Sequence, residues 1–334
     1  MPRLLSTPWG VCILSAFVAL VAALAALFLG ETTLDVRQLA DRSSVDASIF
    51  FSLRLPRVVL AGLVGMGLSV SGAVLQASLR NPLADPFILG VSGGAALGAG
   101  LAMSLGLSGL GFLSGASVWA LLGALLATLF ILWVGLRVGP GASILLAGVM
   151  FNAFAMALIS VVRALTEPSK LGELLFWLSG VLHHEGPDTL WVLAAAQFLS
   201  FGLLWALASK LNALSLGDED AQSLGIHVRR LHRGLYFLCS LSVASAVAFS
   251  GLIGFVGLLV PHLVRRLLGA DMRIVLPGCA GFGAAFLMLA DMLSRWMFRS
   301  LHTELPVGAI TALVGGPLFF MLWLQSGQRQ VRPE

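Results

Sequence analysis

Residues 57–79 read RVVLAGLVGMGLSVSGAVLQASL, and no charged side chain follows Arg57 within this stretch. A helix that spans a bilayer needs roughly 20 mostly apolar residues. It must also bond every backbone N–H and C=O internally, because the hydrocarbon core contains no water. The stretch meets the requirement of length and composition, so we expect it to form a transmembrane helix.

Similar apolar runs recur along the whole chain of 334 residues. Hydrophobic residues make up 58% of the chain and charged residues 11%, whereas soluble domains carry about 25% charged residues. Runs bounded by Gly, Pro or charge predict spans near 9–29, 57–79, 87–107, 116–136, 143–162, 187–209, 233–250, 253–268, 274–298 and 306–325. A shorter run at 171–182 is too brief to cross, and we expect it at the interface or in a re-entrant segment. The chain is therefore predicted to be an all-α polytopic membrane protein with about ten transmembrane helices, in which residues 1–334 form a single domain.

The distribution of Lys and Arg predicts the orientation of these helices. Most basic residues fall in the inner loops if the N-terminus is cytoplasmic, as the positive-inside rule requires. Both termini are then cytoplasmic, and the protein is expected in the cell inner membrane. Arg54, Arg57 and Arg295 remain on the outer side, where the rule would deplete them. The middles of the ten predicted spans are almost free of charge, and Asp291, near one end of its span, is the main exception.

The longest inner loop, at about 211–232, contains one predicted helix. Gly217 and Asp218 suit a helix N-cap, acidic residues follow in the first turn, and Leu224 with Gly225 closes the helix. A short amphipathic cytoplasmic helix is expected. It would dock a partner or lie on the membrane surface, and docking is the interpretation that we favour.

The chain shows no means of powering transport by itself. It lacks the G-x-x-x-x-G-K-[ST] loop that cradles nucleotide phosphates, so it is not expected to hydrolyse ATP. A secondary transporter usually needs intramembrane carboxylates for an ion or proton relay. The middles of the predicted spans contain almost none, with Asp291 the main exception. Coupling energy is therefore expected to come from another chain. The cysteines and histidines form no cluster with metal-ligand spacing, so neither a metal nor a cofactor is expected.

The segment 90–94 reads GVSGG and matches G-x-S-x-G, the pattern around a nucleophilic serine. An intramembrane serine hydrolase using Ser92, with His262 as a base, is therefore a remote alternative. A nucleophile elbow belongs on a strand-to-helix turn, whereas this motif lies in a Gly/Ala-rich apolar helix. Gly90, Gly94 and Gly98 recur every four residues, which is typical of close helix packing. Packing is the interpretation that we favour.

Eight short motifs spread over nearly the whole chain resemble one family of membrane proteins. The motifs are RLPR at 54–57, SGAVLQ at 71–76, NPLADP at 81–86, LLAGV at 145–149, GFVGL at 254–258, PH at 261–262, LPG at 276–278 and ELPVG at 304–308. Together they resemble the permease subunits of type II ABC importers, the FecCD-type family that carries ferric siderophores, vitamin B12 and haem. The GVSGG segment also fits the family's pattern, which argues against a hydrolase.

The resemblance implies a ten-helix subunit, not itself an enzyme, that pairs with a second copy of itself as a homodimer. Two ATP-binding cassette subunits would lie below it and a periplasmic or extracellular binding protein above it. The expected function is import of a ferric siderophore or related metal chelate, with cobalamin or haem as alternatives, since the shared motifs do not identify the cargo.

The resemblance also implies roles for particular residues. It places Asn81 and Leu83 at a cytoplasmic gate, whose other part would lie at Gly141 and Ala142, where relatives carry hydroxyl residues. The ATPase-coupling residues that it implies are Leu216, Gly217, Asp218, Glu219, Ala221, Leu224 and Gly225.

The three outer arginines receive a docking role from the same resemblance. In the family, arginines at the positions of Arg54, Arg57 and Arg295 pair with glutamates on the binding protein. A guanidinium suits this task because its planar fork holds a carboxylate with two hydrogen bonds. Contact with lipid phosphates is the alternative.

Overall fold

The computed structural model describes residues 7–30, 35–41, 43–138, 142–183 and 186–330. Within these ranges every regular element is helical, apart from an isolated bridge between Leu110 and Leu113. A helix occupies each of the ten predicted spans: α1 (Pro8–Phe28), α3 (Leu55–Ser78), α4 (Val91–Leu105), α5 (Gly115–Val138), α6 (Ala142–Leu165), α8 (Pro187–Ala206), α11 (Val228–Ser250), α12 (Val256–Leu268), α13 (Met272–Leu301) and α14 (Val307–Gln330). The prediction of an all-α polytopic membrane fold is confirmed.

The spans differ in length. Seven helical stretches in the described part of the chain are long and apolar enough to cross a membrane. The helix α12 has 13 residues, which rise about 20 Å, less than the hydrocarbon core of about 30 Å. It follows the break predicted after α11, because Gly251 adopts φ +64 and ends that helix. The helix α4 is also short, with 15 residues.

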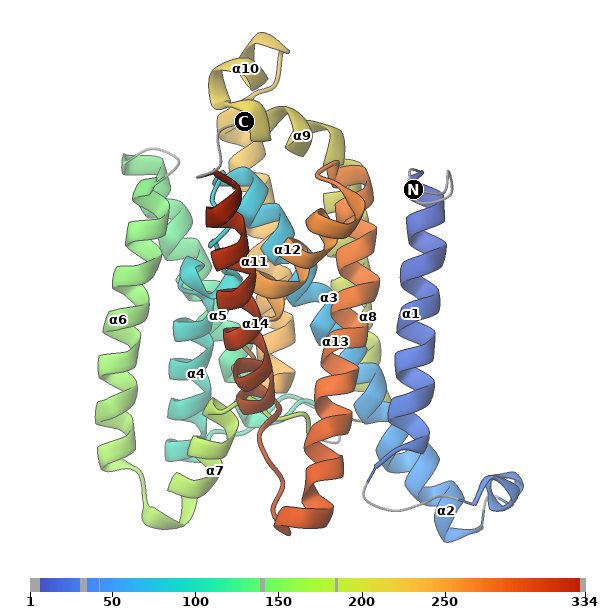
Figure 1. Cartoon of the computed structure of the whole chain (residues 1–334). Helices are drawn as coiled ribbons and strands as arrows, with labels where there is room; N and C mark the ends of the chain where they lie inside the picture. Colours follow the sequence, from blue (N-terminus) through green and yellow to red (C-terminus); the bar gives the residue numbers. More distant parts are fainter. Residues whose placement is uncertain (1–6, 31–34, 42, 139–141, 184–185, 331–334) are drawn as a thin grey trace.

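Short helical elements connect the spans at both ends of the bundle. They are η2 (Val36–Ala40), α2 (Val45–Ser48), the π-helical η3 (Ile49–Arg54), η4 (Pro86–Leu89), α7 (Pro168–Leu178), α9 (Ala208–Leu216) and α10 (Asp218–Ser223). The helix α7 has 11 residues and covers 171–178 of the run at 171–182 that was too short to cross. Figure 1 shows α10 at the same end as the start of α1 and the end of α14, with α2 and α7 at the opposite end.

The helix α3, which contains the stretch quoted at the start, lies at the centre of the bundle (Figure 1). In the most apolar 18-residue stretch of this helix, 94% of the residues are buried, as expected for a helix that is hydrophobic all round. Small residues allow its neighbours to approach closely. A Cβ atom on Gly65 would overlap the carbonyl oxygen of Gly283 in α13, and one on Gly72 would overlap that of Gly257 in α12. The backbone of α3 is therefore in direct contact with both helices.

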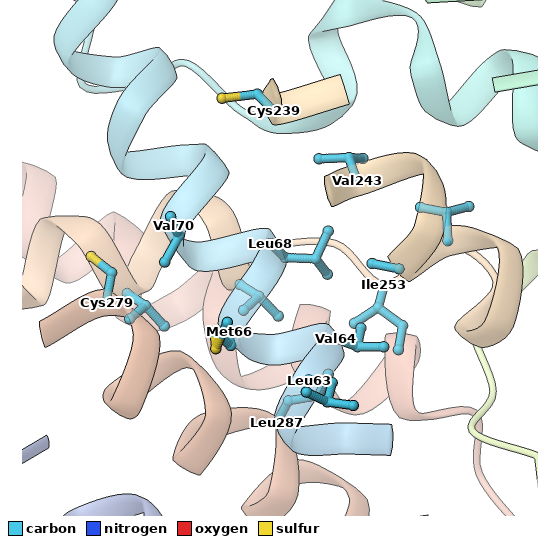
Figure 2. Close-up of a cluster of buried hydrophobic side chains, with 14 of the residues drawn as sticks. Leu63, Val64, Met66, Leu68, Val70, Cys239, Val243, Ile253, Cys279 and Leu287 are labelled. Carbon is cyan, nitrogen blue, oxygen red and sulfur yellow. The ribbon is translucent and has the colours of Figure 1, made fainter. Parts of the chain in front are cut away.

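Side chains from three helices complete this core. Figure 2 shows side chains of α3 beside those of α11, α13 and the segment between α11 and α12, and the labelled residues are Leu63, Val64, Met66, Leu68, Val70, Cys239, Val243, Ile253, Cys279 and Leu287. Cys239 and Cys279 are buried free thiols here. They behave as small hydrophobic residues.

Peripheral helices have the opposite burial pattern. Only 17% of the residues in the most apolar stretch of α6 are buried, and 28% of the residues in the corresponding stretches of α1 and α8. Phe154 on α6 and Trp191 on α8 are 62% and 76% exposed. Exposed apolar area on this scale is unusual for a soluble monomer. These faces are suited to contact with lipid or another membrane-embedded chain.

The glycines at 90, 94 and 98 have two different surroundings. A Cβ on Gly94 would overlap the carbonyl oxygen of Gly123 in α5, and one on Gly98 would overlap that of Trp119. These two glycines therefore let α4 and α5 pack backbone to backbone. Gly90 precedes α4 with φ +78, a left-handed conformation that glycine adopts readily, and a Cβ there would lie 3.1 Å from Phe151 in α6 and 3.2 Å from Ile131 in α5.

We predict that Gly94→Leu prevents correct folding, because the added side chain would force α4 and α5 apart. Overpacked sites typically cost about 1–3 kcal/mol, and overlap with backbone lies at the upper end. The control is Gly202→Leu in α8, where a Cβ would meet nothing within 4 Å. The monodisperse fraction of detergent-solubilised protein after heating should fall for Gly94→Leu alone. Equal behaviour of the two variants would contradict the packing role.

Candidate functional site

The end of the bundle opposite α10 contains an arginine cluster, which comprises Arg54, Arg57, Asp291, Arg295 and Glu304. The Nε of Arg57, in the first turn of α3, lies 2.7 Å from Oδ1 of Asp291 in α13. The Nε of Arg295 lies 2.9 Å from Oδ2 of the same carboxylate. Nη2 of Arg57 also lies 2.5 Å from Oε1 of Glu304, in the segment between α13 and α14. Asp291 is fully buried, so both of its oxygens are paired where water does not reach.

The same cluster closes the end of α1. Nη1 of Arg54 donates to the carbonyl oxygen of Leu27 at 2.9 Å, and Nη2 of Arg295 donates to that of Ala26 at 2.9 Å. The last carbonyls of a helix lack intrahelical donors and carry partial negative charge. A Cβ on Gly30 would lie 3.2 Å from Arg54 and 3.3 Å from Arg295, so glycine leaves room for both guanidinium groups.

The structure places the three arginines that the resemblance assigns to binding-protein docking inside this cluster, where they are largely buried. Arg54 and Arg295 are 6% and 5% exposed, and 17% of the Arg57 side chain is exposed. Their negative partners are Asp291, Glu304 and the end of α1, all within the same chain. The sequence did single out Asp291 as an intramembrane charge, but its pairing with Arg57, 234 positions away, depends on the fold.

At the other end of the bundle, α10 begins and ends at the positions that the capping residues in the sequence predicted. Gly217 precedes it, Leu224 follows it, and Gly225 adopts φ +78. Ala221 within this helix is buried, whereas Leu216 and Leu224 on either side of the helix are 71% and 65% exposed. Leu216, the last residue of α9, and Leu224, just past α10, therefore present apolar side chains outward, whereas Ala221 within α10 faces the protein.

The turn after α3 holds the two expected gate residues. Oδ1 of Asn81 accepts from the backbone N–H of Leu83 at 2.9 Å, and Leu83 is 47% exposed. Burial raises the pKa of Asp85 to about 6, although the N–H of Phe87 donates to its carboxylate and works against this. Gly141 lies outside the described residues, and Ala142 is the first residue of α6.

The serine and histidine of the hydrolase alternative have separate partners. Oγ of Ser92 donates to the carbonyl oxygen of Phe87 at 3.3 Å, and the ring of His262 packs edge-on against Phe319, with centroids 6.1 Å apart. In the ranges that the structure describes, no three His, Cys, Asp or Glu residues are grouped as metal ligands. The geometry shows no nucleophile and base in contact at this serine.

The arrangement matches a known family along most of its length. The model of the FecCD transport family matches residues 18–325. The chain belongs to the FecCD transport family. Members of this family are transport permease subunits and not enzymes, so the hydrolase alternative is set aside. The resemblance carried by the eight motifs is confirmed.

Individual members of the FecCD family and one solved structure agree with this assignment. The chain is 42% identical to the hemin transport system permease of Yersinia pestis, over 93% of this chain and 94% of that one. It is 40% identical to the cobalamin import system permease of Halobacterium salinarum, over 81% and 72%. A solved structure, described as an inward-facing ABC transporter of the metal-chelate type, has a TM-score of 0.85 and 32% identity and covers 94% of this chain and 98% of its own.

We predict that Asp291→Asn destabilises the protein more than Glu304→Gln. The first change leaves Arg57 and the buried Arg295 without their shared carboxylate, and breaking a buried ion pair typically costs about 3–5 kcal/mol. Glu304 is 32% exposed, so its pair is partly screened by solvent and contributes less. The Tm of the solubilised protein should therefore fall clearly for Asp291→Asn and slightly for Glu304→Gln. Equal shifts would show that Asp291 does not organise the cluster.

Proposed function

We propose that this FecCD family permease imports a metal chelate across the cell inner membrane, as one of two identical copies joined to two ATPase subunits and supplied by a binding protein. The observation that carries the proposal is the similarity, over most of both chains, to permeases named for hemin and cobalamin. The cargo is then haem, cobalamin or a ferric siderophore, which share a metal held by a large organic ligand.

The exposed leucines on either side of α10 support an ATPase as the partner at this end. Leu216 and Leu224 flank the helix and project away from the protein. At an aqueous surface such side chains gain free energy when a partner covers them. We infer that this end is cytoplasmic, that both termini lie there with it, and that α10 seats in the ATPase.

The binding protein is proposed to dock at the opposite end, where the arginine cluster lies. Arg57 is the one of the three predicted arginines that keeps noticeable exposure, at 17% of its side chain. Docking through Arg54 or Arg295 would require either side chain to leave a buried site and its hydrogen bonds to α1. The electrostatic contribution to docking is therefore assigned to Arg57.

We predict that the double change Leu216→Asp and Leu224→Asp abolishes co-purification with the ATPase subunit while leaving the permease folded. Charges at these positions cannot be buried against an apolar groove without a large desolvation penalty. The matched control is Leu110→Asp, a 69% exposed leucine between α4 and α5. Unchanged co-purification of the double variant would exclude α10 as the ATPase contact.

Transport itself is tested with the purified complex in proteoliposomes. With the binding protein outside and ATP inside, we expect accumulation of one of three cargoes, namely haem, a ferric hydroxamate siderophore or cobalamin. Haem is tested first because the hemin permease matches this chain nearly from end to end. Complexes carrying an ATPase subunit that cannot hydrolyse ATP serve as the control. Absence of ATP-dependent uptake of all three would overturn the proposal.

A further inference from the structure

The helix α3 ends in a turn whose key position normally requires glycine. The N–H of Arg80 donates to the carbonyl oxygen of Ala77 at 3.3 Å, and the N–H of Asn81 donates to that of Gln76 at 3.1 Å. These two bonds form a Schellman motif, in which the residue just past the helix is left-handed. Arg80 occupies that position with φ +50, and only two other non-glycine residues in the described part of the chain have positive φ. An arginine here is conformationally unfavourable, so its side chain needs another explanation.

The side chain of Arg80 reaches α10. Its Nη2 lies 3.5 Å from Oδ1 of Asp218, the first residue of that helix. Nη1 lies 3.6 Å from the place where a Cβ on Gly217 would be, an ordinary van der Waals distance, so the guanidinium lies beside the start of α10. Arg80 therefore contacts the start of α10 from the end of α3.

A second contact holds the same carboxylate from the side of α11. Oδ2 of Asp218 lies 3.8 Å from Nε2 of His232, which is 3% exposed. Nδ1 of this ring lies 2.9 Å from Oγ of Ser78, in the last turn of α3. Asp218 thus contacts two side chains that connect it to α3. Arg80 lies just past the end of α3, and His232 contacts Ser78 in its last turn.

The turn that follows Arg80 is closed by its own hydrogen bonds. The N–H of Ala84 donates to the carbonyl oxygen of Asn81 at 3.1 Å, and the Asn81 side chain accepts from Leu83. A displacement of Asp218 that moved Arg80 would move this turn as a unit, because Arg80 is bonded directly to its first residue.

We propose that Arg80 is a positioning residue that transmits movement of α10 to the turn at residues 81–84, so that ATP hydrolysis below opens or closes the path above. This inference rests on the proposed function, since it requires an ATPase that moves α10. The choice of arginine over glycine at a left-handed position follows from that role. A glycine would form the turn more easily but would remove the direct contact between the turn and α10.

The test uses Arg80→Gly in the complete complex in proteoliposomes. Glycine suits the left-handed conformation, so the Tm should be unchanged or higher. The complex should assemble with its ATPase and hydrolyse ATP, but chelate imported per ATP hydrolysed should fall about fivefold or more. The matched control is His302→Gly, which replaces another exposed left-handed residue (φ +52) after α13, far from α10. Import per ATP should not change in this control.

Charge exchange separates a specific pair from a general loss of charge. Asp218→Asn should reduce import per ATP as Arg80→Gly does. The double change Arg80→Asp with Asp218→Arg should restore part of it, because aspartate tolerates the left-handed conformation better than most residues.

Three outcomes would count against this inference or its basis. Normal import per ATP in Arg80→Gly would reject the link to α10 while leaving the proposed function intact. Loss of ATPase binding in Arg80→Gly would make Arg80 a docking contact and would also reject the link. Absence of ATP-dependent import in the unaltered complex would instead reject the proposed function.

Discussion

The direct backbone contact of α3 with α13 and α12 is the constraint on which the rest of the bundle depends. Without side chains at Gly65 and Gly72, the central helix lies against Gly283 and Gly257. Packing among helices in a membrane cannot rely on exclusion of water, because lipid is as apolar as the side chains. Close contact between backbones, together with side-chain hydrogen bonds to backbone carbonyls, provides the stabilisation instead. Oγ of Ser69 adds to it by donating to the carbonyl oxygen of Cys279 at 2.6 Å.

The arginine cluster is one consequence of that contact. Because α3 and α13 are held side by side, Arg57 on one helix meets Asp291 on the other. The positive charges of Arg54 and Arg295 would repel that of Arg57 if no negative group lay beside them. Arg295 shares the Asp291 carboxylate, and Arg54 donates to the partial negative charge at the end of α1. The cluster therefore joins three helices at one end and leaves little of its charge for solvent.

The two ends of the bundle are organised in different ways, and this difference suits an importer. At the cluster end, charged groups are buried and paired within the chain. At the α10 end, the structure exposes apolar leucines and places Asp218 within reach of Arg80 beside the turn at 81–84. A surface that a partner moves needs exposed contacts and a connection to the bundle, which the pair of Asp218 and Arg80 provides. The arginine cluster at the other end holds the helices together while that surface moves, so it needs interactions that are not exchanged with water.

The sequence by itself determined the helices, the bounds of α10 and the family, because each of these depends on local properties. A span is defined by its own length and apolarity, and a cap at Gly217 by the residues next to it. Roles that depend on distant partners were decided only by the tertiary structure. Arg54 and Arg295 look like free outer charges in the sequence, yet they are buried because the close packing of α1, α3 and α13 brings carboxylate and carbonyl oxygens to them. In the same way Gly90 and Gly94 share one motif, but only the fold places Gly90 against side chains of α5 and α6 and Gly94 against the backbone of α5. Burial and pairing are properties of two segments at once, and the sequence of either segment alone does not contain the distance between them.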